Sequence, residues 1–226
     1  MSDASPVKVA IVGASGYSGE ELVNRLLHHP QAELTAVTSR QYAGQTLSQI
    51  FPRFAGQGVA DTLQFTEPDP AALAAAAEIV FLALPHGVAA EYAQSLLDAG
   101  VKVIDLSADF RLTDPAVYEE FYGNPHPAPD LLAEAVYGMP ELHRDAIRTA
   151  RLIASPGCYP TSILLPTTPL LKAGIITDRT KSFYSTYVDM DELKNEGDEM
   201  VGDAIAEKGI EFLKTVNFGA KPVAAE

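Results

Sequence analysis

The segment that most constrains the fold lies near the N-terminus, where a short apolar run meets a glycine-rich turn. Residues 7–12 read Val-Lys-Val-Ala-Ile-Val, a β-branched composition typical of a parallel strand covered on both faces. The run stops at residues 13–19, Gly-Ala-Ser-Gly-Tyr-Ser-Gly, and helical periodicity follows. The apolar positions on one face of that helix are Leu22, Val23, Leu26 and Leu27. Ser18 and Glu21 have the spacing of a capping box and predict that the helix opens there.

A strand, a three-glycine turn and a helix N-terminus together form a cradle for the pyrophosphate of a dinucleotide. Small residues let the backbone approach the phosphates, whose charge is stabilised by free N–H groups and the helix dipole. The spacing here is G-x-x-G-x-x-G, a variant of the more familiar G-x-G-x-x-G. Alone, this spacing is weak evidence, and a plain glycine-rich turn is the alternative. Its place between a strand and a helix favours the dinucleotide site.

The end of the second predicted strand indicates which dinucleotide is bound. Residues 34–38 form the strand, and Ser39 and Arg40 follow. A site for NAD places a carboxylate here for the ribose 2′-hydroxyl, whereas a hydroxyl and a guanidinium suit a 2′-phosphate. The sequence therefore favours NADP, with a solvated loop cation as the alternative interpretation of Arg40.

Strands and helices alternate through the next 60 residues. After an irregular excursion over 41–68, a helix is predicted at 70–77, a strand at 78–84, a helix at 88–99 and a strand at 101–106. This alternation predicts an α/β fold with a doubly wound parallel sheet.

Four candidate site residues fall directly after these strands, where such sheets bind their ligands. They are Pro85 and His86 after one strand, and Ser107 and Asp109 after the next. For His86, a turn histidine without a role is an equally open interpretation.

The single cysteine, Cys158, follows a short predicted strand at 151–154 and lies in the turn Ser-Pro-Gly-Cys-Tyr-Pro-Thr. A lone cysteine is most often a small buried hydrophobe. A turn at a helix start instead exposes the sulfur and favours its thiolate, as a nucleophile requires. The apolar segment that follows is predicted to be interrupted by Pro166 and Pro169. Beside a nicotinamide cofactor, such a thiol suggests a thioester that a hydride reduces to an aldehyde.

From about Val7 to Ile176 the chain resembles the N-acetyl-gamma-glutamyl-phosphate reductases of arginine biosynthesis. The motifs, in order, are VAIVGASGYSG (9–19), LPHG (84–87), DLSADFR (105–111), YGMPE (137–141) and SPGCYPT (155–161). Aspartate-semialdehyde dehydrogenases share the architecture but not this set. The resemblance implies a Rossmann-type NADP-binding domain over 1–154 and the start of an α+β catalytic domain at 155–226.

The resemblance also implies a reaction, the reduction of an acyl phosphate to a semialdehyde by NADPH. Cys158 would attack the acyl carbon, while Ser107 and Arg111 would face the substrate. The residues implied to contact NADP are Gly13, Ser15, Gly16, Tyr17, Ser18, Gly19, Ser39, Arg40, Pro85 and His86. No metal site is expected.

The resemblance stops near residue 178. Family members continue with a second domain that supplies a general acid/base histidine, but all five histidines here precede Cys158. In the unmatched part, residues 182–188 have the pattern of a strand, and the apolar residues of 200–216 have the spacing of one face of a helix. The acidic residues of 189–199 are interpreted as a solvated face. An NADP-binding relative without full activity, or a reductase of a carrier-attached acyl phosphate, are the alternative functions.

Charge and targeting patterns limit the partners. A net charge of −14 disfavours nucleic-acid and membrane-surface binding, and one cysteine excludes an internal disulfide. The polar first six residues resemble no signal peptide, so a cytoplasmic location is expected. A homo-oligomer is left open.

Overall fold

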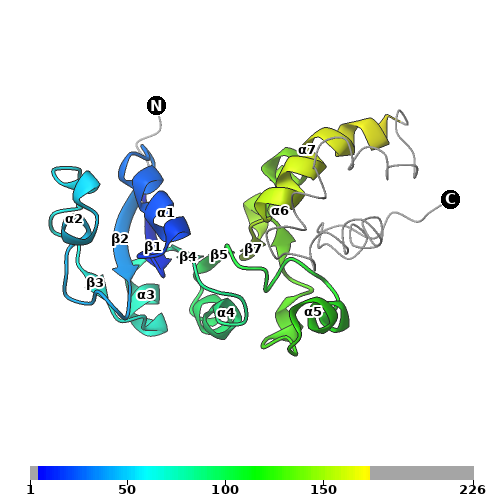
Figure 1. Ribbon diagram of the computed structural model, residues 1–226, viewed down its shortest axis with the longest axis horizontal. Coiled ribbons are helices and arrows are strands. Elements are labelled where there is room, and N and C mark those ends of the chain that lie inside the picture. Colours follow the sequence, from blue (N-terminus) through cyan, green and yellow to red (C-terminus); the bar gives the residue numbers. More distant parts are fainter. Residues whose placement is uncertain (1–4, 174–226) are drawn as a thin grey trace, which may run out of the picture.

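The computed structural model describes residues 5–173, which form a seven-stranded sheet with helices on both faces (Figure 1). Every strand pair is parallel, and the strand order is β3-β2-β1-β4-β5-β7-β6. The strands are β1 (Val7–Val12), β2 (Ala32–Thr38), β3 (Phe65–Thr66), β4 (Ile79–Leu82), β5 (Lys102–Asp105), β6 (Val136–Tyr137) and β7 (Leu152–Ala154).

Helices connect these strands as crossovers. They are α1 (Tyr17–Leu27), α2 (Leu47–Ile50), α3 (Pro70–Ala76), α4 (Ala89–Asp98), α5 (Pro115–Tyr122), α6 (Pro140–Thr149) and α7 (Cys158–Lys172), with 3-10 turns at Pro52–Phe54 and Pro129–Leu131. Figure 1 shows α3, α4 and α5 on one side of the sheet, and α1, α6 and α7 on the other. The predicted doubly wound parallel sheet is confirmed.

The two layers follow from the alternation of side chains along β1. Val9 and Ile11 are buried in a cluster with Val23 and Leu26 of α1. Ala10 and Val12 belong instead to a cluster that includes the buried side chains of α4. Because successive residues of a strand face opposite sides, an almost continuous apolar run is what a strand covered on both faces requires.

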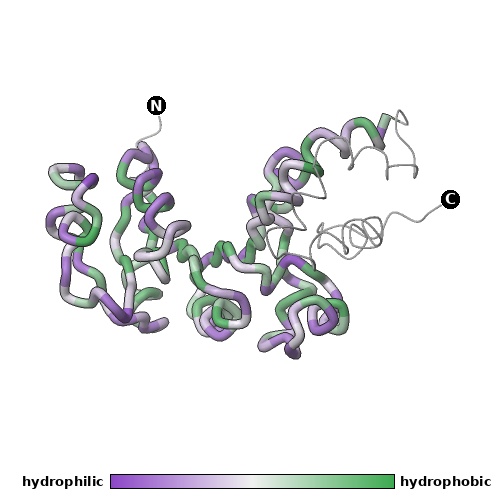
Figure 2. Tube along the Cα trace, in the orientation of Figure 1, coloured by the Kyte–Doolittle hydropathy of each residue, from purple (hydrophilic) through white to green (hydrophobic). Residues whose placement is uncertain are grey.

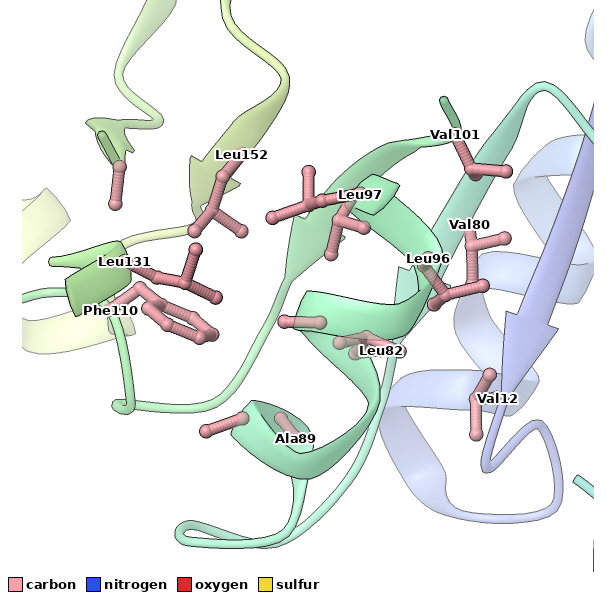
Figure 3. Close-up of a cluster of buried hydrophobic side chains, with 14 of the residues drawn as sticks. Val12, Val80, Leu82, Ala89, Leu96, Leu97, Val101, Phe110, Leu131 and Leu152 are labelled. Carbon is pink, nitrogen blue, oxygen red and sulfur yellow. The ribbon is translucent and has the colours of Figure 1, made fainter. Parts of the chain in front are cut away.

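The larger apolar cluster packs α4 onto the middle of the sheet (Figure 3). Leu96 and Leu97 of α4 are 0% and 2% exposed and belong to the same buried cluster as Val80 and Leu82 of β4. Burying one such side chain stabilises the fold by about 1.5–3 kcal/mol. Along the chain, hydrophobic segments alternate with hydrophilic ones in the helices, as expected for elements with one covered face (Figure 2).

The predicted capping box at Ser18 and Glu21 is wrong. Helix α1 begins at Tyr17, its N-cap is Gly16, and no side chain caps it. Ser18 therefore already lies inside the first turn. The reason is the preceding turn, in which the Gly16 N–H donates to the Gly13 carbonyl and the Gly16 carbonyl accepts from Glu20.

The segment after Cys158 also differs from its prediction, because α7 continues through Pro166 and Pro169. Both prolines are exposed, so the carbonyls that lose an N–H donor lie toward solvent, while Leu164 is buried. The Thr167 hydroxyl donates to the Ile163 carbonyl at 2.7 Å and adds a bond within this helix.

Residues 41–68 are ordered around short elements rather than irregular throughout. They contain α2, one 3-10 turn and β3, and bury Leu47, Phe54 and Phe65. Within residues 5–173 no helix is long and apolar enough to span a bilayer, and no cluster of potential metal ligands is found. The patterns noted at 182–188, 189–199 and 200–216 lie outside the described residues.

Candidate functional site

Five of the loops that contain the predicted site residues follow the carboxyl ends of neighbouring strands. Because all strands are parallel, these ends share one edge of the sheet. Along this edge come Ser39 and Arg40 after β2, the glycine turn after β1, Pro85 and His86 after β4, Ser107 to Arg111 after β5, and Cys158 after β7. Neighbouring strands lie about 4.8 Å apart, so β2 and β7 are separated by roughly 19 Å.

Two of the three glycines in the turn after β1 are required by packing. Gly13 has φ +80°, and a Cβ there would overlap the Ala83 carbonyl oxygen of the neighbouring loop. A Cβ on Gly19 would lie 2.5 Å from both the Ala14 Cα and the Gly13 oxygen. These contacts hold α1 tightly against the end of β1.

Gly16 differs from both, because the fold itself does not need it to be glycine. Its φ is −82°, and a Cβ would meet only the Gly13 carbonyl oxygen, at 3.7 Å. Gly16, Tyr17 and Ser18 are all exposed, with Tyr17 96% exposed. The N-terminus of α1 thus presents first-turn amides with no side-chain cap, an arrangement suited to an anion.

The loop after β2 lies beside this helix end. The hydroxyls of Ser15 and Ser39 are 2.9 Å apart, which links the glycine turn to the end of β2. Arg40 is exposed, and its Nη2 donates to the hydroxyl of Tyr92 on α4 at 3.3 Å. The guanidinium therefore projects toward solvent at the end of β2 with its other donors open to a ligand.

The N-terminus of α4 is closed by the protein itself. The Asp109 carboxylate, which is fully buried, accepts from the Ala90 N–H at 3.1 Å and from the Gly87 N–H at 2.7 Å. It also accepts from the Tyr118 hydroxyl at 3.0 Å. Of the two neighbouring helix N-termini at this edge, that of α1 is open to an external anion, whereas that of α4 already binds the Asp109 carboxylate.

His86 is exposed at the end of the turn after β4, and its ring is held on two sides. Its Nδ1 accepts from the Ala108 N–H at 2.9 Å, so the imidazole proton resides on Nε2. Its ring lies 5.5 Å from that of Tyr122, centre to centre. The side chain of His86 therefore has a fixed tautomer, with an N–H donor on the nitrogen that Ala108 does not contact.

Ser107 is buried, and its hydroxyl has two partners within the chain. It donates to Asp105 at 2.7 Å and accepts from the Asp109 N–H at 3.1 Å. Burial raises the pKa of Asp105 to about 6, against the opposing effect of the two hydrogen bonds from Ser107. A direct contact of Ser107 with substrate stays a prediction.

Arg111 joins the loop after β5 to the loop that precedes Cys158. Its Nε donates to the Ser155 carbonyl at 2.8 Å and its Nη2 to the Leu106 carbonyl at 2.7 Å. A Cβ on Gly157 would lie only 3.1 Å from Nη1, so the guanidinium passes directly beside this glycine. Both bonds go to carbonyl oxygens, so Arg111 braces the loop that precedes Cys158.

Cys158 is exposed at the first residue of α7. Thr161 closes the first turn by donating from both its N–H and its hydroxyl to the Gly157 carbonyl, at 3.0 and 2.8 Å. The thiol thus stands at the carboxyl edge of the sheet, on a turn fixed by Arg111 and Thr161, where a bound acyl group can reach it.

Sequence reasoning missed most of what supports these residues. It placed Asp109 among possible ligand contacts, whereas the carboxylate bonds the chain itself. It assigned nothing to Tyr118, or to His126, whose Nε2 donates to the Asp109 carbonyl and whose Nδ1 accepts from Ala128. The one available signal is the alternation of Asp105, Ser107 and Asp109 directly after an apolar strand.

Comparisons with known proteins agree with this architecture. The family model for the NAD-binding domain of semialdehyde dehydrogenases matches residues 8–150. The chain is 61% identical over 171 residues to the N-acetyl-gamma-glutamyl-phosphate reductase of Akkermansia muciniphila, covering 75% of this chain and 49% of that protein. It is 54% identical over 170 residues to the enzyme of the same name from Nitrosococcus oceani, with the same coverage of 75% and 49%. The chain thus spans about half the length of the curated relatives it matches.

Solved structures support the fold. Aspartate semialdehyde dehydrogenase with NADP from Candida albicans superimposes with a TM-score of 0.56 at 17% identity, over 75% of this chain and 48% of that one. Aspartate semialdehyde dehydrogenase II from Vibrio cholerae gives 0.54 at 20% identity, over 75% and 44%. With the family match covering residues 8–150, the chain belongs to the semialdehyde dehydrogenase family and contains its NAD-binding domain.

Proposed function

We propose that this chain takes part in the NADPH-dependent reduction of N-acetyl-glutamyl 5-phosphate to N-acetyl-glutamate 5-semialdehyde, a step of arginine biosynthesis in the cytoplasm. The observation that supports it most is the order of groups along the sheet edge. A cation, an open helix N-terminus, a fixed imidazole, a guanidinium and an exposed thiol follow one another from β2 to β7. That order matches an extended dinucleotide followed by a reacting acyl carbon. The names of the most similar relatives supply the substrate.

The residues at the open end of α1 fit a dinucleotide. Gly16 leaves space that a Cβ would take, and the uncapped first turn offers N–H donors to a pyrophosphate. Ser15, Tyr17 and Ser18 would border it, with Gly13 and Gly19 setting the turn. Ser39 and Arg40 would hold the 2′-phosphate that distinguishes NADP from NAD. Pro85 and His86 would border the nicotinamide, which supplies a hydride when NADPH is bound.

Cys158 would provide the covalent step. Its thiolate attacks the acyl carbon, a carbon–sulfur bond forms, and phosphate leaves with the electrons of the broken carbon–oxygen bond. The thioester carbon held on Cys158 would accept the hydride that bound NADPH supplies, and loss of the carbon–sulfur bond would then release the semialdehyde and return the thiolate. Arg111 would keep the Cys158 turn in place through Ser155 and would face the substrate together with Ser107.

The reaction is tested in the reverse direction with the full chain, N-acetyl-glutamate 5-semialdehyde, phosphate and NADP⁺, by NADPH absorbance. We expect turnover that Cys158→Ser abolishes. NADPH binding without any turnover would instead support a cofactor-binding relative, and turnover unchanged in Cys158→Ser would overturn the role of the thiol.

The cofactor preference is tested separately by comparing NADPH with NADH. We expect Arg40→Ala to weaken NADPH binding about tenfold, since a charge-assisted hydrogen bond is lost, and to leave NADH binding unchanged. Arg25→Ala serves as the matched control, because Arg25 forms an exposed pair with Glu21 within α1. Equal losses for both cofactors would contradict a 2′-phosphate contact.

A further inference from the structure

The Asp109 carboxylate is the most heavily used buried acceptor at the sheet edge, although it lies behind the residues that face a ligand. It is fully buried and accepts from two backbone amides, Gly87 and Ala90, and from the hydroxyl of Tyr118. A buried carboxylate is stable only when its oxygens are hydrogen-bonded, and here three donors supply that. Two of the donors belong to the turn that contains His86 and to the start of α4.

Three separate contacts link Asp109 and its chain neighbour Ala108 to His86. The first is the Gly87 amide, which is adjacent to His86 in the chain. The second is the Ala108 N–H, adjacent to Asp109, which donates to His86 Nδ1.

The third contact runs through aromatic rings. Tyr118 donates its hydroxyl to Asp109 and stacks on Tyr122, with ring centroids 4.7 Å apart and an interplanar angle of 30°. Tyr122 in turn lies 5.5 Å from the ring of His86. Two of these contacts start at the Asp109 carboxylate, through Gly87 and Tyr118, and the remaining one starts at the neighbouring backbone, through the Ala108 N–H.

We propose that Asp109 is a positioning residue that fixes the tautomer and direction of the His86 imidazole, so that Nε2–H is presented as a hydrogen-bond donor to a carbonyl oxygen of bound NADPH. The inference rests on the proposed function for the identity of the ligand, but the fixed tautomer belongs to the chain without a ligand. His86 is exposed and has Nε2 directed away from the Ala108 contact, so it can meet a cofactor that Asp109 itself cannot reach.

The test substitutions are Asp109→Asn and Tyr118→Phe. In Asp109→Asn only one oxygen remains, so it can accept either from the Gly87 N–H and the Tyr118 hydroxyl or from the Ala90 N–H, and the NH2 group faces the donors that are left without an acceptor. Tyr118→Phe removes only the hydroxyl, keeps the ring stack, and serves as the second variant if Asp109→Asn does not fold. Asp114→Asn is the matched control, because Asp114 is an exposed N-cap of α5 in the same segment and bonds only Ala116 among the hydrogen bonds described for its side chain.

The readouts are the imidazole ¹⁵N signals of the free full-length chain and the dissociation constant of NADPH. The wild-type His86 signals, assigned by comparison with His86→Gln, are expected to show the Nε2–H tautomer alone. Asp109→Asn is expected to show mixed tautomers and to weaken NADPH binding about tenfold. Tyr118→Phe is expected to change both readouts in the same direction as Asp109→Asn but to a smaller extent. Asp114→Asn is expected to change neither readout.

Wild-type-like His86 signals in Asp109→Asn and Tyr118→Phe would overturn the inference, whatever the cofactor affinity. Altered signals with unchanged NADPH affinity would overturn the proposed donor role of His86. If the wild-type chain binds no NADPH, the proposed function fails, and the same ¹⁵N signals still decide whether Asp109 fixes the tautomer.

Discussion

Two glycines of the turn after β1, Gly16 and Gly19, are expected to affect stability and cofactor binding in opposite ways when each is replaced by alanine. In Gly19→Ala the new Cβ lies 2.5 Å from backbone atoms of Gly13 and Ala14, which cannot move aside as a flexible side chain would. In Gly16→Ala the nearest atom, the Gly13 oxygen, is 3.7 Å away, an ordinary contact. The two substitutions add the same methyl group three residues apart, which makes them a matched pair.

The expected magnitudes follow from these distances. Gly to Ala inside a helix stabilises by about 1 kcal/mol when space allows. At Gly19 the overlap forces α1 away from the strand end, and such overpacking costs about 1–3 kcal/mol, so the net change is destabilising. At Gly16, loss of an N-cap glycine costs about 0.5–1 kcal/mol and the reduced entropy of the unfolded chain offsets about 0.4–1 kcal/mol. Gly16→Ala is therefore close to neutral for stability.

Cofactor binding is expected to reverse this order. The methyl group of Gly16→Ala occupies the space in which a pyrophosphate would approach the open end of α1, and we expect NADPH binding to weaken at least about tenfold. Urea unfolding of the full chain measures stability, and NADPH fluorescence measures affinity. Gly16→Ala with native stability and native NADPH affinity would refute the assignment of this turn, and Gly19→Ala more stable than wild type would refute the packing argument.

Three further predictions concern the rest of the sheet edge. Because burial raises the pKa of Asp105 from 3.8 to about 6, the folded chain binds this proton at a higher pH than the unfolded chain does. Asp105 therefore adds up to about 3 kcal/mol to the free energy of unfolding below pH 4, and this contribution is lost as the pH rises through 6. Urea unfolding from pH 4 to 7 should show this slope in wild type and not in Asp105→Asn. Gly157→Ala should destabilise the fold by about 1 kcal/mol and lower turnover, because its Cβ would lie 3.1 Å from Arg111 Nη1. An unchanged rate of turnover would contradict the role of Arg111 in bracing the loop before Cys158. Cys158, exposed and the only cysteine, should react with one equivalent of a disulfide reagent in the folded chain, and Cys158→Ser should change unfolding by less than about 0.5 kcal/mol.

The elements that the sequence predicted are those with strong local signals. α2 and β3 lie in the segment 41–68 that was expected to be irregular. The apolar run of β1, the glycine turn, β2 and the alternation of strands and helices from α3 to β5 determine which loops reach the sheet edge, and all of these were predicted. β6 was not, because its two residues, Val136 and Tyr137, are too few to show a period.

The prediction was weakest where tertiary contacts decide. The capping box at Ser18 has the right spacing, but the Gly13–Gly16 turn makes Gly16 the N-cap, two residues earlier. Pro166 and Pro169 are tolerated in α7 because they lie on its exposed side. Three of the partners of Asp109 and Arg111, namely Gly87, Ala90 and Ser155, lie 19 to 44 residues away in sequence, so spacing alone does not reveal them.

The insertion of β7 between β5 and β6 has a consequence for the order of folding. Among the strands that the structure describes, β7 is the last in sequence and is hydrogen-bonded to both neighbours, so residues 136–137 are connected to the rest of the sheet only through residues 152–154. Pairing of β5 with β7 also requires closing a loop of more than 40 residues, the kind of non-local contact that slows folding. Since β7 leads directly into the turn of Cys158, the thiol reaches its place at the edge in the same late event. During synthesis, the dinucleotide cradle around Gly16 can therefore form well before the nucleophile that acts beside it.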